Sequence, residues 1–214
     1  MNLPEYEIRP IRKGLPIKRL SIMDFKNAAP AILRNAVTGK APAQHAEARL
    51  LWDSKSLYAC FLCEAGRPLA TLRKHDAPLY KESVVELFID PLGLGKAYYE
   101  LEINPLNASF DALILNDFQK GKGRGPRFQG FTGWDPRSLE HRSLKAEGLW
   151  IVFLKIDLMD LFLAPRLPVK KGDVWRGNFF RIDCEKGRTE YCAWSPMGKL
   201  DFHCPDRFGV WKFA

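Results

Sequence analysis

A short segment near the C-terminus, LDFHCPDRFG at residues 200–209, gathers side chains that often carry out chemistry. His203 and Cys204 are adjacent in it, with an aspartate on either side of the pair. A cysteine nucleophile needs a histidine base oriented by a third group, and a zinc site needs several ligands that converge on one point. Neighbouring residues of an extended chain point in opposite directions, and the other histidines stand at no recognisable metal-ligand spacing. The segment therefore leaves both chemistries open but carries a local signature of neither.

Two glutamates in strand-like segments, Glu86 and Glu102, form a candidate acid/base pair. Glycosidases place two carboxyl groups about 5–9 Å apart, and neighbouring strands allow that separation. Carboxylates on a shared sheet face also commonly bind a ligand without catalysis, or only face water. The spacing therefore leaves catalysis, ligand binding and plain solvation open for this pair.

The five cysteines show no recognisable metal or disulfide framework. Cys60 and Cys63 have the spacing of half a zinc or redox motif, but they lie in a strand-like run, where residues three apart point to opposite faces. We expect both to be small, buried hydrophobic residues. A hairpin turn at EKGR sets Cys184 opposite Thr189, so a disulfide between Cys184 and Cys192 is not expected.

Nine segments are rich in β-branched and aromatic residues and read as strands, with turn residues between many of them. Short strands at this spacing predict an all-β fold: an antiparallel β-sandwich of the jelly-roll or immunoglobulin-like kind, forming a single domain over residues 1–214. One short helical turn is expected at 159–165. The nine segments are 48–53, 56–65, 83–90, 97–104, 109–115, 149–157, 175–183, 190–195 and 209–214.

The alternation of residue types assigns side chains to the two faces of neighbouring strands. In AYYELEIN, residues 97–104, the odd-numbered apolar residues share one face, and the other face carries Glu100 and Glu102. In SVVELFID, residues 83–90, Glu86 lies on the face opposite the odd-numbered apolar residues. Paired as a hairpin, these strands would have one dry face and one face with carboxylates, an amide and aromatic rings. Such a face suits sugar binding, and a plain solvated sheet face is the alternative.

Composition and charge exclude some classes of protein. The 214 residues are 46% hydrophobic, 12% aromatic and 27% charged, which suits a globular core. No apolar run approaches the roughly 20 residues of a membrane span, so no membrane partner is expected. The net charge of +8 gathers partly in KGKGRGPRFQG, residues 120–130, which suits either phosphate contacts or a solvated loop. This loop lacks the ending of a nucleotide-binding loop. A solvated loop is the expected interpretation, and a nucleic-acid partner is not expected.

The expected location is the cytoplasm. No continuous apolar stretch follows the basic residues of the N-terminus, so the chain as given shows no signal peptide. The odd number of cysteines favours a reducing compartment in the same way. Secretion is the alternative if a signal has been removed.

Four segments, in this order, resemble carbohydrate-binding module family 9 and its stand-alone, family-9-like relatives. The similarity extends from about residue 49 to 213, and SVVELFIDP and FHCPDRFG are its specific blocks. The resemblance implies an antiparallel β-sandwich that binds a mono- or oligosaccharide without catalysis. The four segments are ARLLWDSKSLYACFLCEA, LYKESVVELFIDPLGLGKAYYELEINPLNASFDALI, GDVWRGNFFRID and AWSPMGKLDFHCPDRFGVWKF.

The resemblance also implies which residues bind the sugar. Family members clamp a sugar ring between two aromatic side chains, which here are Tyr80 and Phe202, and a glutamate kept here as Glu86 forms hydrogen bonds. Glu102 stands where the family has a sugar-contacting arginine, and Lys199 stands where it has an asparagine. The groups available for hydrogen bonds beside this clamp are Glu86, Glu102, Lys199, Asp201 and His203.

Further expectations concern cofactors and the alternative functions. Family members can carry structural calcium, whose ligands cannot be assigned from this sequence, and no other cofactor is expected. Some related sandwich domains hold haem, for which His203 and Met197 are the candidate ligands. A saccharide-acting enzyme that uses Glu86 and Glu102 is the alternative to simple binding. The sequence does not set the oligomeric state.

Overall fold

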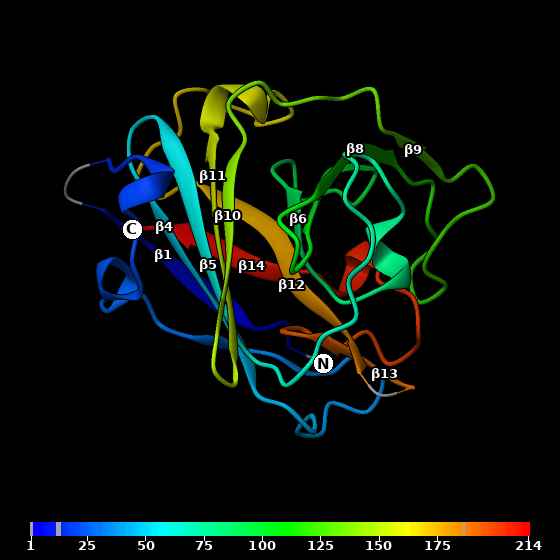
Figure 1. Cartoon of the computed structure of the whole chain (residues 1–214). Helices are drawn as coiled ribbons and strands as arrows, with labels where there is room; N and C mark the ends of the chain where they lie inside the picture. Colours follow the sequence, from blue (N-terminus) through cyan, green and yellow to red (C-terminus); the bar gives the residue numbers. More distant parts are fainter. Residues whose placement is uncertain (1, 12–13, 186) are drawn as a thin grey trace.

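A computed structural model describes residues 2–11, 14–185 and 187–214 as an all-β molecule with short 3-10 turns (Figure 1). Within these residues the strands are β1 (Glu5–Pro10), β2 (Ala31–Ile32), β3 (Arg34–Asn35), β4 (Ala46–Trp52), β5 (Ser56–Glu64), β6 (Val84–Asp90), β7 (Ala97–Ile103), β8 (Ser109–Leu115), β9 (Gln129–Phe131), β10 (Glu140–Ala146), β11 (Leu149–Asp157), β12 (Val174–Glu185), β13 (Arg188–Ala193) and β14 (Gly209–Phe213). The 3-10 turns are η1 (Ile17–Arg19), η2 (Ile22–Phe25), η3 (Leu79–Lys81), η4 (Leu158–Asp160) and η5 (Pro205–Arg207).

The strands form two layers that β1 joins. The first layer has the order β10-β11-β5-β4, and the second has the order β14-β12-β6-β7-β8-β9, with β13 beside β12. Residues 5–8 of β1 pair in parallel with β14, and residues 9–10 pair in parallel with β4. The other ladders among the described strands are antiparallel. The predicted sandwich is therefore confirmed, but the sheet is mixed at β1, because β1 runs in the same direction as both of its neighbours.

Apolar side chains from both layers fill the space between them. The odd-numbered residues of β6 and β7 point into this core, as the alternation predicts, and Leu87 and Leu101 are at most 1% exposed. Phe61 from β5 packs edge-on against Phe179 of β12, with ring centroids 6.1 Å apart. Each such side chain contributes roughly 1.5–3 kcal/mol when fully buried. This core holds β6 and β7 rigidly, and it thereby fixes the position of their even-numbered residues.

The other face of the second layer is also buried, under the segment between β13 and β14. Phe88, Tyr98 and Phe180 point to this outer face and form a second hydrophobic cluster, to which Cys204 and Phe208 contribute from the covering segment. The Phe88 ring contacts the Phe180 ring edge-on at 4.9 Å. The second layer therefore has apolar side chains on both faces.

The polar residues on this outer face are buried as well. Glu86, Glu100 and Glu102 are 2%, 6% and 0% exposed, and Glu86 lies opposite Glu102 in the ladder between β6 and β7. The alternative of a plain solvated face on these strands is therefore wrong. Alternation along a strand separates its two faces, but it does not reveal that distant loops will cover the polar one.

All nine expected strands are present, with ends that differ by at most two residues, and the turn expected within 159–165 forms as η4. Five strands had no clear sequence pattern. Two of them, β2 and β3, are only two residues long, and β9 and β10 have no buried residue and so no apolar alternation. The fifth, β1, has only two buried residues, Tyr6 and Ile8, between the charged residues Glu5, Glu7 and Arg9.

The cysteines behave as the strand pattern predicts. Cys60 and Cys63 are both buried in β5 and belong to hydrophobic clusters on opposite faces of the strand. Cys184 lies opposite Thr189, as the expected turn requires, although residue 186 within that turn is outside the described residues. All five cysteines are free thiols.

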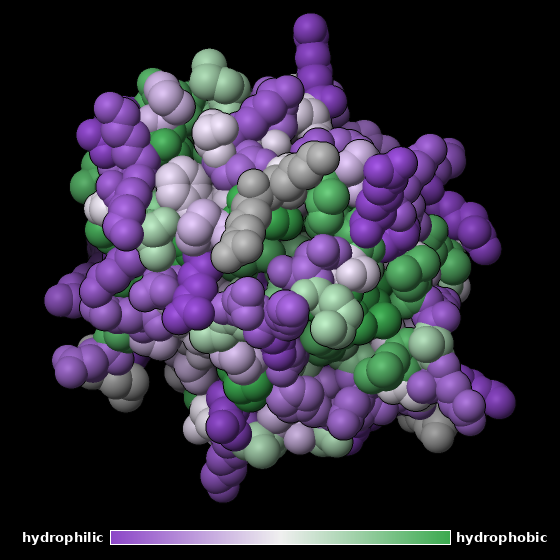
Figure 2. Space-filling model, turned by 90° about the vertical axis from the view of Figure 1, so that its left-hand side faces the viewer, coloured by the Kyte–Doolittle hydropathy of each residue, from purple (hydrophilic) through white to green (hydrophobic). Residues whose placement is uncertain are grey.

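The described helical turns are short. None of them is long and apolar enough to cross a membrane. Figure 2 shows one face of the molecule, on which hydrophilic side chains cover most of the area and hydrophobic ones form separate patches between them. Such a mixture is ordinary for the surface of a folded protein.

Candidate functional site

A cavity of about 560 Å³ lies on the outer face of the second layer. Its floor comes from even-numbered residues of the central strands, and its walls come from the loop before β6 and the segment after β13. Its volume falls within the range typical of small-molecule sites. Aromatic rings are prominent in the lining: Tyr80, Phe110, Phe128, Tyr191 and Phe202.

Phe202 forms one wall of the cavity. Its ring stacks on Phe180 of β12, with centroids 4.2 Å apart and an interplanar angle of 14°, and meets Tyr191 edge-on at 6.1 Å. The backbone N–H of Cys204 donates a hydrogen bond to the Phe202 carbonyl at 2.8 Å. Because Phe180 occupies one face of the ring, a molecule in the cavity meets the other face or the edge.

Tyr80 forms part of another wall. It lies in η3, and 48% of it is exposed, while its ring meets Phe110 edge-on with centroids 6.4 Å apart. Glu82, directly after η3, accepts hydrogen bonds from the backbone N–H groups of Thr71 and Leu72 at 2.6 and 3.2 Å. Burial raises the pKa of Glu82, but a hydrogen bond from the Thr71 hydroxyl and these two backbone bonds outweigh it and lower the pKa. They tie the loop before β6 to the base of the turn that presents Tyr80.

Three glutamates meet at the floor of the cavity. Glu86 comes from β6, and Glu100 and Glu102 come from β7; one carboxylate oxygen of each lies within 4.8 Å of the other two. Glu86 and Glu100 line the cavity, whereas the fully buried Glu102 does not. Glu86 Oε1 and both Glu102 oxygens have no hydrogen-bond partner of normal geometry among the described residues. We call these three residues the carboxylate cluster.

The carboxylate cluster is strongly perturbed electrostatically. Burial and the charge of Glu100 raise the pKa of Glu86, and burial and both neighbouring carboxylates raise the pKa of Glu102. Burial raises the pKa of Glu100 to about 7, even though a hydrogen bond with Glu102 and the charge of Arg124 act against the rise. Like charges in a dry site cannot all ionise, so the cluster retains protons at neutral pH.

His203 lies beside this floor. Its Nδ1 is 3.0 Å from Tyr98 Oη, and its Nε2 is 4.0 Å from Glu100 Oε2. Asn116 Nδ2 donates hydrogen bonds to Tyr98 Oη at 3.2 Å and to the His203 carbonyl at 3.3 Å. Burial lowers the pKa of His203 to about 3, so the ring is neutral at pH 7. It therefore brings no compensating charge to the carboxylate cluster.

Arg124 is the permanent cation among the described residues that line the cavity, and it is already paired. Its Nε is 3.3 Å from Asp201 Oδ1, and its backbone N–H donates to Asp201 Oδ2 at 3.3 Å. Its guanidinium also lies over the ring of Phe128, 5.5 Å from the centroid. Asp201 in turn accepts a hydrogen bond from the His203 backbone N–H at 3.1 Å.

The sequence matches the family model of carbohydrate-binding family 9 over residues 44–213. The chain belongs to carbohydrate-binding family 9. Solved structures with the same fold include a proposed carbohydrate-binding protein from Bacteroides uniformis, which is 18% identical, with a TM-score of 0.76 and 98% of this chain and 99% of the other covered. No curated protein sequence matches the chain.

Two further similar structures are family 9 modules from Caldicellulosiruptor kristjanssonii. One, in complex with glucose, is 12% identical, has a TM-score of 0.68 and covers 99% of this chain and 96% of the module. The other, in complex with cellotriose, is 13% identical, has a TM-score of 0.69 and covers 98% of this chain and 93% of the module. At such low identity the likeness establishes the fold.

The family 9 fold brings most of the predicted binding residues to one cavity. Glu102 lies beneath the floor and does not line the cavity. Lys199 does not line it either, and its Nζ donates a hydrogen bond to the Gly121 carbonyl at 3.3 Å. Their role in binding, like that of the residues that do line the cavity, stays a prediction. Those lining residues are Tyr80, Glu86, Asp201, Phe202 and His203.

Glu100 and Arg124 are among the residues of this family 9 cavity that sequence reasoning did not select. Glu100 had a usable signal, because alternation already placed it on the same face as Glu102. Arg124 lies in the basic 120–130 loop, for which phosphate contacts or solvation were the expected roles. Its pairing with Asp201, 77 residues away, follows no local pattern.

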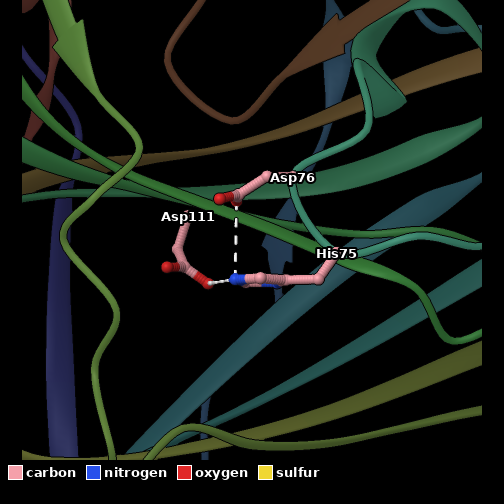
Figure 3. A group of neighbouring side chains, drawn as sticks. All are labelled: His75, Asp76 and Asp111. Carbon is pink, nitrogen blue, oxygen red and sulfur yellow. Dashed lines mark ion pairs between the residues drawn. The ribbon is translucent and has the colours of Figure 1, made fainter.

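A second acidic group lies outside the carboxylate cluster, where His75 and Asp76 meet Asp111 of β8 (Figure 3). His75 Nε2 is 3.6 Å from Asp76 Oδ1 and 3.9 Å from Asp111 Oδ1, and it also lies 2.9 Å from Asp135 Oδ1. Burial raises the pKa of Asp111 to about 7, and the hydrogen bond with Asp135 raises the pKa of His75. The imidazole thus already serves as the ion-pair partner of these carboxylates.

Neither acidic group fits the structural calcium that the family implies. Calcium takes six to eight oxygen ligands, including carbonyls and water. The group in Figure 3 contributes a nitrogen whose hydrogen bond with Asp135 is already made. The carboxylate cluster contributes three carboxyl groups. The calcium expectation stays a prediction without assigned ligands.

The sulfur-containing candidates lie beneath the cavity. Cys204 and Met197 are buried in the hydrophobic cluster of the outer face, and neither lines the cavity beside His203. Burial raises the pKa of the Cys204 thiol to about 12, which leaves the thiolate unpopulated at neutral pH. Of the two residues that suggested a Cys-His nucleophile, Cys204 thus has a packing role, whereas His203 lines the cavity.

Proposed function

We propose that this family 9 protein binds carbohydrate without catalysis, with a sugar ring held in the cavity between Tyr80 and Phe202. The observation that carries the proposal is that both aromatic residues line one cavity whose floor holds Glu86. Aromatic faces bury the C–H faces of a sugar ring, and polar groups at the edge take up its hydroxyls. The cavity offers both kinds of surface.

The ligands in two similar solved structures support a sugar as the ligand of this chain. The two Caldicellulosiruptor kristjanssonii modules were solved in complex with glucose and with cellotriose. We extend to this chain only the general statement that a mono- or oligosaccharide is bound. The contacts of Tyr80, Phe202 and the carboxylates with that sugar are part of the proposal.

Weak binding is expected. Burial of about 100 Å² of apolar surface against the two rings contributes about 2.5 kcal/mol. A millimolar complex needs about 4 kcal/mol, so hydrogen bonds must supply the remainder. Glu86, Asp201 and His203 are in the cavity to form them.

Isothermal titration with glucose, cellobiose and xylobiose tests this function. We expect binding by the wild-type protein and a loss of at least about tenfold in affinity for Tyr80→Ala and for Phe202→Ala. Phe162→Ala is the matched control, because Phe162 is 56% exposed and does not line the cavity. Absence of heat with every sugar, or equal affinities in all three variants, would refute the proposed site.

A cytoplasmic location accompanies this proposal. All five thiols are free and buried, which suits a reducing compartment. Fractionation of source cells, followed by detection with an antibody against the purified protein, tests it; recovery of the protein mainly outside the cells would contradict it.

A further inference from the structure

The cavity floor has a charge imbalance that the nearest cation, Arg124, offsets only in part. Glu86, Glu100 and Glu102 bring together three carboxyl groups, each at most 6% exposed. The nearest permanent cation in the lining, Arg124, is held by Asp201 through its side chain and its backbone. Buried carboxylates are normally paired with a cation or hydrogen-bonded, and here three carboxylate oxygens have no partner of normal geometry.

One unpartnered oxygen, Glu86 Oε1, belongs to a side chain that lines the cavity. Glu86 is 98% buried by its neighbours, yet it lines the cavity together with Glu100. The aromatic walls of the same cavity are an independent indication of a ring-shaped ligand. A ligand held against Tyr80 and Phe202 would therefore meet two acidic groups at the floor, with Glu102 directly behind them.

The geometry of the carboxylate cluster suits one protonated amine. One oxygen of Glu86 and one of Glu100 lie no more than 4.8 Å apart, so a single nitrogen in the cavity can lie about 2.8 Å from both. That separation matches a charge-assisted N–H···O bond, which is about 2.7–2.9 Å long. An ammonium group has three N–H donors, enough for one bond to each of the two carboxyl groups that line the cavity, Glu86 and Glu100. A calcium ion, in contrast, would need several more oxygen ligands.

We propose that the sugar bound in this cavity carries a protonated amine, as an amino sugar with an unacetylated 2-amino group does, and that Glu86 and Glu100 bind that ammonium group. This inference rests on the proposed function of the cavity and names the class of its ligand. Glu102 lies directly behind this pair, and one of its carboxylate oxygens is within 4.8 Å of theirs. The net charge of +8 disfavours cationic ligands elsewhere on the protein, so the selectivity is local to this floor.

Proton release accompanies this binding. The carboxylate cluster holds protons when the cavity is free of a cation, and an ammonium group favours the ionised carboxylates. Affinity for an amino sugar will therefore rise as the pH increases from 5.5 to 7. Affinity for an uncharged sugar will change less, because a neutral carboxyl group can donate a hydrogen bond to a hydroxyl.

The test compares three monosaccharides that differ at one substituent: glucose, glucosamine and N-acetylglucosamine. Titrations at pH 7 should give an affinity for glucosamine at least about tenfold higher than for the other two. Repetition in two buffers with different heats of protonation should reveal proton release with glucosamine alone. Glu86→Gln and Glu100→Gln should each remove the preference for the amine, whereas Glu140→Gln, at an exposed position on β10, should keep it.

The outcomes separate this inference from the proposed function. Binding of glucose with no preference for glucosamine would overturn the amine inference and leave sugar binding in place. No binding of any of the three sugars would overturn both. The last measurement is a titration with calcium chloride alone. The carboxylate cluster would be a metal site if the wild type binds calcium, both glutamine variants lose that binding, and glucosamine is not preferred. That result would overturn the amine inference. Urea unfolding of each variant verifies that it is folded.

Discussion

Replacement of Glu100 by glutamine will stabilise the protein at neutral pH and leave its stability in mild acid nearly unchanged. Glu100 is 6% exposed, and burial raises its pKa from an ordinary value of 4.5 to about 7. Between these two pH values the folded state holds a proton on Glu100 that the unfolded state has released. Stability therefore falls as the pH rises, because the folded state binds more protons than the unfolded state.

The magnitude follows from the two pKa values. Their difference corresponds to about 3 kcal/mol, at 1.36 kcal/mol for each pKa unit. The stabilisation is fully present below about pH 4.5 and is lost as the pH rises through about 7. His203 acts in the opposite direction below pH 6.5, because burial lowers its pKa to about 3 and its folded state then binds fewer protons. Both the wild type and the variant contain His203, so its contribution drops out when their unfolding free energies are subtracted.

Urea unfolding at pH 4.5, 5.5, 6.5 and 7.5 measures the effect. The gap in unfolding free energy between Glu100→Gln and the wild type should open by about 2–3 kcal/mol over this range, in favour of the variant. The control is Glu140→Gln, whose partner Lys155 lies 2.7 Å away and whose side chain is 43% exposed. The unfolding free energies of Glu140→Gln and the wild type should differ by no more than about 1 kcal/mol at every pH. Parallel stability curves for Glu100→Gln and the wild type would refute the buried-carboxylate argument.

Two further predictions concern the core. Arg181→Met should lower the unfolding free energy by about 3–5 kcal/mol, measured by urea denaturation, because it leaves Asp183 buried and unpaired. It also removes a 2.7 Å hydrogen bond from Arg181 Nη2 to the Glu64 carbonyl, which joins β12 to β5; a loss below 1 kcal/mol would count against this role. The five thiols should react with a disulfide reagent only after unfolding, since all are buried; stoichiometric labelling of the folded protein would contradict the structure.

Sequence alone was enough for most of the architecture, because the strands that carry the core also carry a strong alternation. In β6 the residues Val85, Leu87 and Ile89 alternate with Glu86 and Phe88, and this pattern fixes both the strand and its two faces. The short turn between β6 and β7 then leaves little choice of partner, so the opposition of Glu86 and Glu102 was accessible as well.

The remaining features depend on contacts between residues far apart in the chain. β1 lies beside β14 and β4 in parallel, which no turn residue signals. The wall formed by Phe202 depends on its stacking against Phe180, which lies in a different strand. The carboxylate cluster is dry because loops from three parts of the chain cover it. No periodicity within β6 or β7 carries that information, and for this reason a solvated face was an open alternative.

The placement of the carboxylate cluster argues for a role in binding rather than in folding. A buried carboxyl group without a partner reduces stability, and a better-packed apolar residue would remove that cost. Glu102, behind the floor, shows the cost most directly, since it is completely buried and both burial and its two neighbouring carboxylates raise its pKa. Strained or unpaired groups of this kind are expected where a ligand offsets them. A cationic group entering between Tyr80 and Phe202 would do so, because it reaches Glu86 and Glu100 through the cavity without moving the core behind them.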